Sequence, residues 1–135
     1  MPGGPEGYPE RMSARTSLFF GCLLAGVAVA LGAFGAHALK ERFTPEVLAN
    51  WRTGVRYQMW HALALVALGL WLRARGGKSF AGWLFLVGSV FFSGSLYLLC
   101  FELWKPVVGP ITPLGGTFLL GGWATFAWTA IRSET

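Results

Sequence analysis

The side chains that could do chemistry in this 135-residue chain form no recognised catalytic pattern. Zinc sites take three or four protein ligands, and the two histidines, His37 and His61, are poor evidence for one. Ser93–Ser95 lacks the setting of a nucleophile elbow, and the paired glycines of the last stretch match no phosphate-binding loop with a lysine. The sequence therefore predicts no metal site, no cofactor and no catalytic residue, and an enzyme is the least favoured function class.

Polar side chains instead gather at one depth, toward the same end of four apolar stretches. This set, here called the loop-side polar cluster, comprises His37, Asn50, Arg52, Arg56, Tyr57, His61, Tyr97 and Glu102. Polar groups in lipid are costly unless they are hydrogen-bonded, so such groups are usually paired and often functional. Two interpretations stay open: a binding site for a ligand or ion, or a polar collar that fixes the helix register near the interface. We expect His61 to face His37, and an arginine of the set to pair with a glutamate or a lipid phosphate.

Four apolar stretches must position these residues, at residues 17–39, 54–72, 80–101 and 111–131. About 20 apolar residues cross the ~30 Å hydrocarbon core as a helix. Only 11 basic and 6 acidic residues are present, too few for the polar surface of a soluble globule of this length. We therefore predict an all-α membrane protein, a compact bundle of four transmembrane helices over residues 16–135. Residues 1–15, rich in proline and glycine, are predicted to form a disordered tail.

The first stretch could alternatively be a cleavable signal peptide. Two arginines precede it, and Ala36–Ala38 fits the small-x-small cleavage pattern. Its uncharged run is longer than a usual signal core, and three further stretches follow, so we favour a retained span. Helix-start signals of the Thr-Pro type stand at Thr44–Pro45 and Thr112–Pro113, ahead of the second and fourth stretches.

Small residues recur at helical spacing, which permits membrane helices to approach closely. The predicted packing positions are Gly21, Ala25, Ala28, Gly32, Gly35, Gly88, Ser95, Gly115 and Gly122. A second stripe on the first span, here called the second α-stripe, consists of Gly26, Ala30, Ala33 and His37. Two small faces on one helix indicate neighbours on two sides. We therefore predict that the first span is the central helix.

Charge bears on partners and on orientation. The formal net charge is +5, but the basic residues are spread over five segments, so nucleic acid is not a predicted partner. With four crossings, both termini lie on one side, here called the terminal side; it holds Arg11, Arg15, Arg73, Arg75, Lys78 and Arg132. The opposite, loop side holds Lys40, Arg42, Arg52, Arg56 and Lys105. Six against five weakly favours cytoplasmic termini in the cell (inner) membrane. The two cysteines, Cys22 and Cys100, should lie near opposite membrane faces, too far apart for a disulfide.

Four segments together resemble a known family. They are Gly32–Leu39 (GAFGAHAL), Trp51–Gln58 with His61–Leu63 (WRTGVRYQ and HAL), Phe92–Tyr97 (FSGSLY) and Ile111–Gly116 (ITPLGG). In this order, over roughly residues 17–128, they resemble the uncharacterised membrane family numbered 423 among the domains of unknown function. The resemblance implies a multi-pass membrane protein, usually bacterial. It supplies no established activity, so it assigns no functional residues.

Two functions remain as hypotheses. The first is a structural or accessory subunit that packs in the lipid bilayer with a second copy of itself or with another membrane protein. The second is a small transporter or channel-like protein, with the loop-side polar cluster as its site. All glutamates of the spans and loops lie near span ends, which argues against a proton-coupled exporter with a deep carboxylate.

Overall fold

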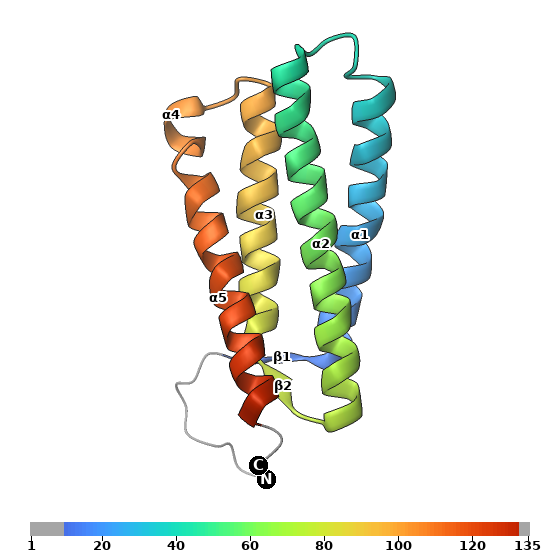
Figure 1. The fold of residues 1–135 in the computed structure, drawn as a ribbon, viewed down its shortest axis with the longest axis vertical. Coiled ribbons are helices and arrows are strands. Elements are labelled where there is room, and N and C mark those ends of the chain that lie inside the picture. The colour runs from blue at the N-terminus through green and yellow to red at the C-terminus, as the bar shows by residue number, and fades with distance from the viewer. Residues whose placement is uncertain (1–9, 133–135) are drawn as a thin grey trace.

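The computed structural model describes residues 10–132; residues 1–9 and 133–135 lie outside the described part. Four long helices run side by side (Figure 1): α1 (Ala14–His37), α2 (Pro45–Arg75), α3 (Ala81–Cys100) and α5 (Ile111–Arg132). A short helix α4 (Lys105–Val108) precedes α5, and two-residue strands β1 (Met12–Ser13) and β2 (Lys78–Ser79) pair antiparallel. The predicted all-α bundle is confirmed, with this small strand pair as an unpredicted addition.

Helix α2 begins where its sequence signal predicts. The hydroxyl oxygen of Thr44 accepts a hydrogen bond from the backbone N–H of Val47 (3.3 Å), and Pro45 occupies the first turn. At ~1.5 Å per residue, its 31 residues extend about 46 Å, longer than a ~30 Å hydrocarbon core. The helix ends at Gly76, whose φ of 82° lies in the region that glycine adopts without strain. The predicted stretch at 54–72 is therefore the inner part of a longer helix.

The prediction of disorder up to residue 15 is wrong for its last part. Met12 is only 1% exposed and pairs with Ser79 across the strand pair. Ser13 caps α1, because its hydroxyl oxygen accepts the backbone N–H of Thr16 (3.2 Å). The apolar side chain of Met12 drives this order, since it fills space beside Gly82 of α3. The rest of the predicted tail, residues 1–9, lies outside the described residues.

The helices pack in an open series rather than around a central α1. Helix α1 lies closely along α2, α2 also packs on α3, and α3 packs on α5. In Figure 1, α1 forms one edge of the bundle and α5 the other. The prediction that the first span is central is therefore wrong. All four residues of the second α-stripe are exposed, and nothing lies within 4 Å of a Cβ placed on Gly26.

Glycines mark the helix contacts. On α1, Gly21 lies against Val66 of α2, and Gly35 lies against the indole of Trp51. On α3 and α5, Gly88 lies against Leu119, Gly122 against Phe85, and Gly115 against the backbone of Phe92. Of the remaining predicted packing positions, Ala28 is fully buried, Gly32 faces Val55, Ser95 faces Thr112 and Ala25 is half-buried. At these positions the missing side chain leaves room for the neighbouring helix.

Much of the outer surface is apolar. Two helices, α1 and α3, are long and apolar enough to cross a membrane. Only 17% and 33% of their most apolar segments are buried, so most of each segment lies at the outer surface. Large side chains such as Phe19, Val29 and Val90 are more than half exposed. A surface of this kind suits a lipid environment.

Candidate functional site

The loop-side polar cluster does not come together as one site. Five of its members are exposed: His37, Asn50, Arg52, Arg56 and Glu102. The other three, Tyr57, His61 and Tyr97, are buried or half-buried between helices. The direction in which each side chain points separates the set into an outer and an inner group, and His61 lies near the middle of α2 rather than at its loop-side end.

The inner set begins with a chain of hydrogen bonds across three helices. The Tyr97 hydroxyl of α3 donates to Oε1 of Gln58 on α2 (2.8 Å). The Gln58 amide in turn donates to the carbonyl oxygen of Leu24 on α1 (2.9 Å). Gln58 is 4% exposed and was not in the predicted set. Its signal was available, because it is an amide side chain within the predicted second span.

His61 uses both of its ring nitrogens inside the bundle. Nδ1 lies 2.7 Å from the carbonyl oxygen of Tyr57, one turn earlier, and can bond it only by donating a proton. Nε2 accepts the indole N–H of Trp123 on α5 (3.0 Å). This geometry requires the neutral ring with its proton on Nδ1. The expectation that His61 faces His37 is wrong, since His61 faces α5 and His37 is exposed at the end of α1.

Other buried hydroxyls also bond across helix contacts. Ser93 of α3 donates to the carbonyl oxygen of Gly54 on α2 (2.6 Å), and Ser17 of α1 donates to that of Leu65 (2.7 Å). Among residues 10–132, the hydroxyl of Ser89 is the one buried side-chain oxygen or nitrogen with no hydrogen-bond partner. The inner polar groups are therefore largely satisfied by neighbouring helices.

The charged members behave differently. Glu102 forms an exposed ion pair with Lys105 (2.8 Å), and this hydrogen bond and charge lower the pKa of the Glu102 carboxyl. No salt bridge joins Arg52 or Arg56 to a glutamate in the part of the chain that the structure describes. The expected pairing of one of these arginines with a glutamate is therefore not observed among the described residues.

An aromatic pocket of about 490 Å³ lies beside His61, open to the outer surface between α2, α3 and α5. Its walls include Tyr57, Trp60, Phe92 and Trp123. The rings of Tyr57 and Phe92 lie 4.5 Å apart, so the wall is well packed. No group of three or more His, Cys or Glu side chains within residues 10–132 could hold a metal ion. Chemically, the pocket offers apolar and aromatic contact rather than charge.

The chain matches one family and many relatives. Residues 31–116 match the family described as "Protein of unknown function (DUF423)". The UPF0382 membrane protein YwdK of Bacillus subtilis is 40% identical over 118 residues, which cover 85% of this chain and 95% of the relative. A UPF0382 membrane protein of Haemophilus influenzae is 41% identical over 111 residues, covering 79% and 86% of the two chains.

The relatives extend beyond bacteria. A UPF0382 membrane protein of the yeast Schizosaccharomyces pombe is 39% identical over 104 residues, covering 73% of this chain and 87% of the relative. No solved structure matches the chain. The named relatives are membrane proteins, in agreement with the apolar outer surface of the bundle. The chain thus belongs to the DUF423 family, a family of membrane proteins without an assigned activity.

Proposed function

We propose that the protein is a structural or accessory membrane subunit, rather than a transporter. One observation carries this proposal: the side chains of Tyr97, Gln58 and His61 form hydrogen bonds with neighbouring helices of the same chain. A transport site needs polar groups that can exchange partners with a passing substrate. Here Tyr97, Gln58 and His61 hold α1, α2, α3 and α5 in register, as a polar collar would.

The partner surface is the second α-stripe. Its small residues lie opposite the face of α1 that contacts α2, and a Cβ at Gly26 would meet nothing within 4 Å. Small residues allow the backbone of another helix to approach closely, whereas contact with lipid chains does not require small residues. We commit to a second copy of this chain as the partner. Two copies inserted in the same direction in one membrane can present the same stripe to each other across a two-fold axis, so the surface serves as its own partner.

The orientation belongs to the same proposal. All four long helices cross the bilayer, and the termini are cytoplasmic in the inner membrane. The sequence places six basic residues at the terminal side and five at the loop side. Lys and Arg are favoured on the cytoplasmic side of a membrane, and this excess supports the orientation.

Cys22 provides a direct test, because it is exposed on α1 one turn before Gly26, whereas Cys100 is buried. Oxidation with copper phenanthroline in native membranes should give a disulfide-linked dimer. Cys22→Ala should abolish the dimer and Cys100→Ala should retain it. Ala30→Leu, on the stripe, should weaken cross-linking, whereas Val27→Leu, on the flank of the same helix, should not. A monomer throughout would refute self-association, and a cross-link to a different membrane protein would identify an accessory subunit of a larger complex.

A transporter or channel-like protein remains the second candidate, because the aromatic pocket reaches His61. A thermal-shift series in detergent, with inorganic ions and small metabolites as probes, separates the two. A probe that raises the unfolding temperature of the wild type and of Arg56→Ala, but not of His61→Ala, would favour the transporter. Arg56 is the control because it lies outside the pocket. Destabilisation by His61→Ala with no shift from any probe supports the collar.

A further inference from the structure

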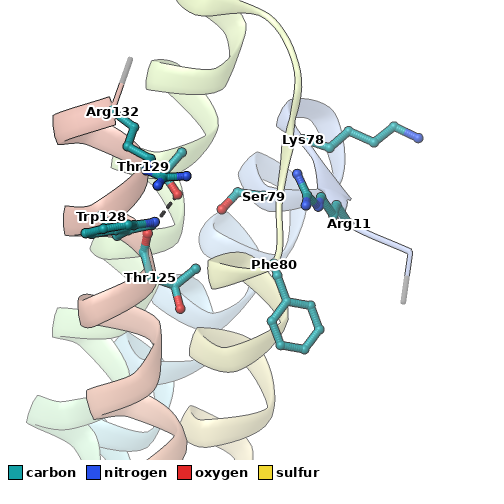
Figure 2. A pocket seen from close by; sticks show the side chains of 8 residues that line it. All are labelled: Arg11, Lys78, Ser79, Phe80, Thr125, Trp128, Thr129 and Arg132. Atoms are coloured by element: carbon teal, nitrogen blue, oxygen red, sulfur yellow. Dashed lines mark hydrogen bonds between the residues drawn. The ribbon is translucent and has the colours of Figure 1, made fainter. Parts of the chain in front are cut away.

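A second pocket, of about 450 Å³, lies at the terminal side of the bundle, far along the helices from His61. Three cationic residues line it: Arg11 before β1, Lys78 in β2 and Arg132 at the end of α5. In Figure 2, Arg132 lies beside Thr129, whereas the Lys78 side chain extends outward from the strand. The hydroxyls of Thr125 and Thr129 on the α5 side donate to backbone carbonyl oxygens of the same helix. Three segments far apart in the sequence therefore bring positive charge to the walls and rim of one hollow.

The strand pair holds two of these cations in place. Met12 pairs with Ser79 and Ser13 with Lys78, which places Arg11 opposite residue 80 across the ladder. The buried side chain of Met12 fixes this strand pair against the bundle. The indole N–H of Trp83 on α3 donates to the carbonyl oxygen of Glu10 (2.7 Å) and ties down the segment before it. The basic rim is thus built by defined backbone contacts rather than by loose side chains at a helix end.

Basic residues outnumber acidic ones at this end of the bundle. By sequence, the terminal side carries six basic residues and three glutamates, Glu6, Glu10 and Glu134. The same side carries three more basic residues outside the pocket, which add to the local positive potential: Arg15, Arg73 and Arg75. Each Lys or Arg near an anionic membrane surface contributes about fivefold to binding.

The pocket also has an apolar side, which selects the kind of anion. Trp128 is 59% exposed and Phe80 is 38% exposed, and both line the pocket. The Arg132 guanidinium lies 4.5 Å from the centroid of the Trp128 ring. Tryptophan at a membrane–water interface sits at headgroup level, where an anionic group and an acyl chain meet. A free phosphate would use the cations and leave this aromatic wall uncovered.

We propose that this pocket binds an anionic phospholipid, with the phosphate against Arg11 and Arg132 and with the exposed Lys78 side chain adding charge at the rim. The acyl chains lie along Phe80 and Trp128 on the bundle surface. This site is independent of the proposed function, because it uses neither the polar collar nor the second α-stripe. It assigns to the small strand pair a role in positioning a lipid at the terminal side.

Native mass spectrometry of the detergent-purified protein, titrated with phosphatidylglycerol and with phosphatidylcholine, tests the site. The wild type should bind phosphatidylglycerol at least about tenfold more tightly than phosphatidylcholine. The variant R11Q/K78Q/R132Q should bind phosphatidylglycerol about 100-fold more weakly, from about fivefold per cation. The control R15Q/R73Q/R75Q removes the same charge from the same side but spares the pocket, and it should keep the preference.

Three results would overturn the proposal. Equal losses in the two triple variants would show a general attraction of the terminal side rather than a site. Equal binding of the two lipids by the wild type would exclude headgroup recognition. Displacement of phosphatidylglycerol by millimolar glycerol 3-phosphate would assign the pocket to a soluble phosphate. Should the pocket triple variant fail to fold, Arg11→Gln alone, at an exposed position, should give the fivefold loss and is judged by the same criteria.

Discussion

Two adjacent glycines of α5, Gly115 and Gly116, differ sharply in their surroundings. A Cβ on Gly115 would meet the backbone nitrogen of Phe92, and would lie 2.8 Å from the Cα of Phe92 and 3.0 Å from the carbonyl oxygen of Gly88. A Cβ on Gly116 would touch only the Phe92 ring, at 3.8 Å, an ordinary contact. The same substitution at neighbouring positions thus separates helix propensity from helix packing.

The magnitudes follow from these distances. Alanine in place of glycine gains about 1 kcal/mol within a helix. Overpacking costs typically about 1–3 kcal/mol, and the upper end applies to Gly115, because the obstacles are backbone atoms of α3 that cannot rotate away. We expect Gly115→Ala to lower the free energy of unfolding by about 2 kcal/mol, and Gly116→Ala to raise it by up to about 1 kcal/mol.

Equilibrium unfolding by titration with sodium dodecyl sulfate, followed by circular dichroism, measures both variants. A thiol-reactive dye in a Cys22→Ser background gives a second probe, because Cys100 is buried and reacts only on unfolding. Gly115→Ala should unfold at a lower detergent fraction than the wild type, and Gly116→Ala at the same or a higher one. If Gly115→Ala were as stable as Gly116→Ala, that result would refute the close approach of α3 and α5 at Gly115.

Two further predictions concern single polar groups. Ser93→Ala should lower the free energy of unfolding by about 1 kcal/mol, within the range measured for hydrogen bonds between membrane helices. Ser89→Ala should be neutral or stabilising, because the buried Ser89 hydroxyl has no partner among the described residues. The same detergent titration measures both variants, and equal losses of stability would contradict this hydrogen-bonding pattern. Lys105→Gln should raise the pKa of the Glu102 carboxyl toward its ordinary value, as followed by NMR titration. Because that pKa is lowered in the folded protein, any stabilisation from the pair is present above the ordinary carboxyl pKa and is lost as the pH falls through the lowered one; an unchanged pKa would exclude the ion pair.

Helices and their starts could be predicted from the sequence where a local signal decides them. Thr44 caps α2 as expected, because its hydroxyl has no stronger competitor. The Thr-Pro pair at Thr112 also predicted a helix start, but Thr112 does not cap α5. The helix already begins at Ile111, and the Thr112 hydroxyl is hydrogen-bonded with Ser95 of α3. The order of Met12 could not be foreseen, because it depends on a partner strand more than 60 residues away in the chain.

The candidate site could be predicted only in part. The position of a residue along a helix sets its height in the bundle, so Tyr97, expected toward the loop side, lies in the last turn of α3. His61 lies near the middle of α2. Which helix each side chain meets depends on how the helices are rotated and ordered. Nothing local in the sequence sets this, so the pairing of His61 with Trp123 of α5 was missed.

The error about α1 bears on the proposed partner. Its two stripes of small residues predicted two neighbouring helices, and the chain itself supplies one, α2. A stripe of small residues indicates close packing against another helix, but it does not indicate whether that helix belongs to the same chain. If the second α-stripe were simply a lipid face, bulky side chains would serve there as well as Gly26 and Ala30 do. The unmatched stripe is therefore the reason to look for the second neighbour outside the chain, in another copy of the protein.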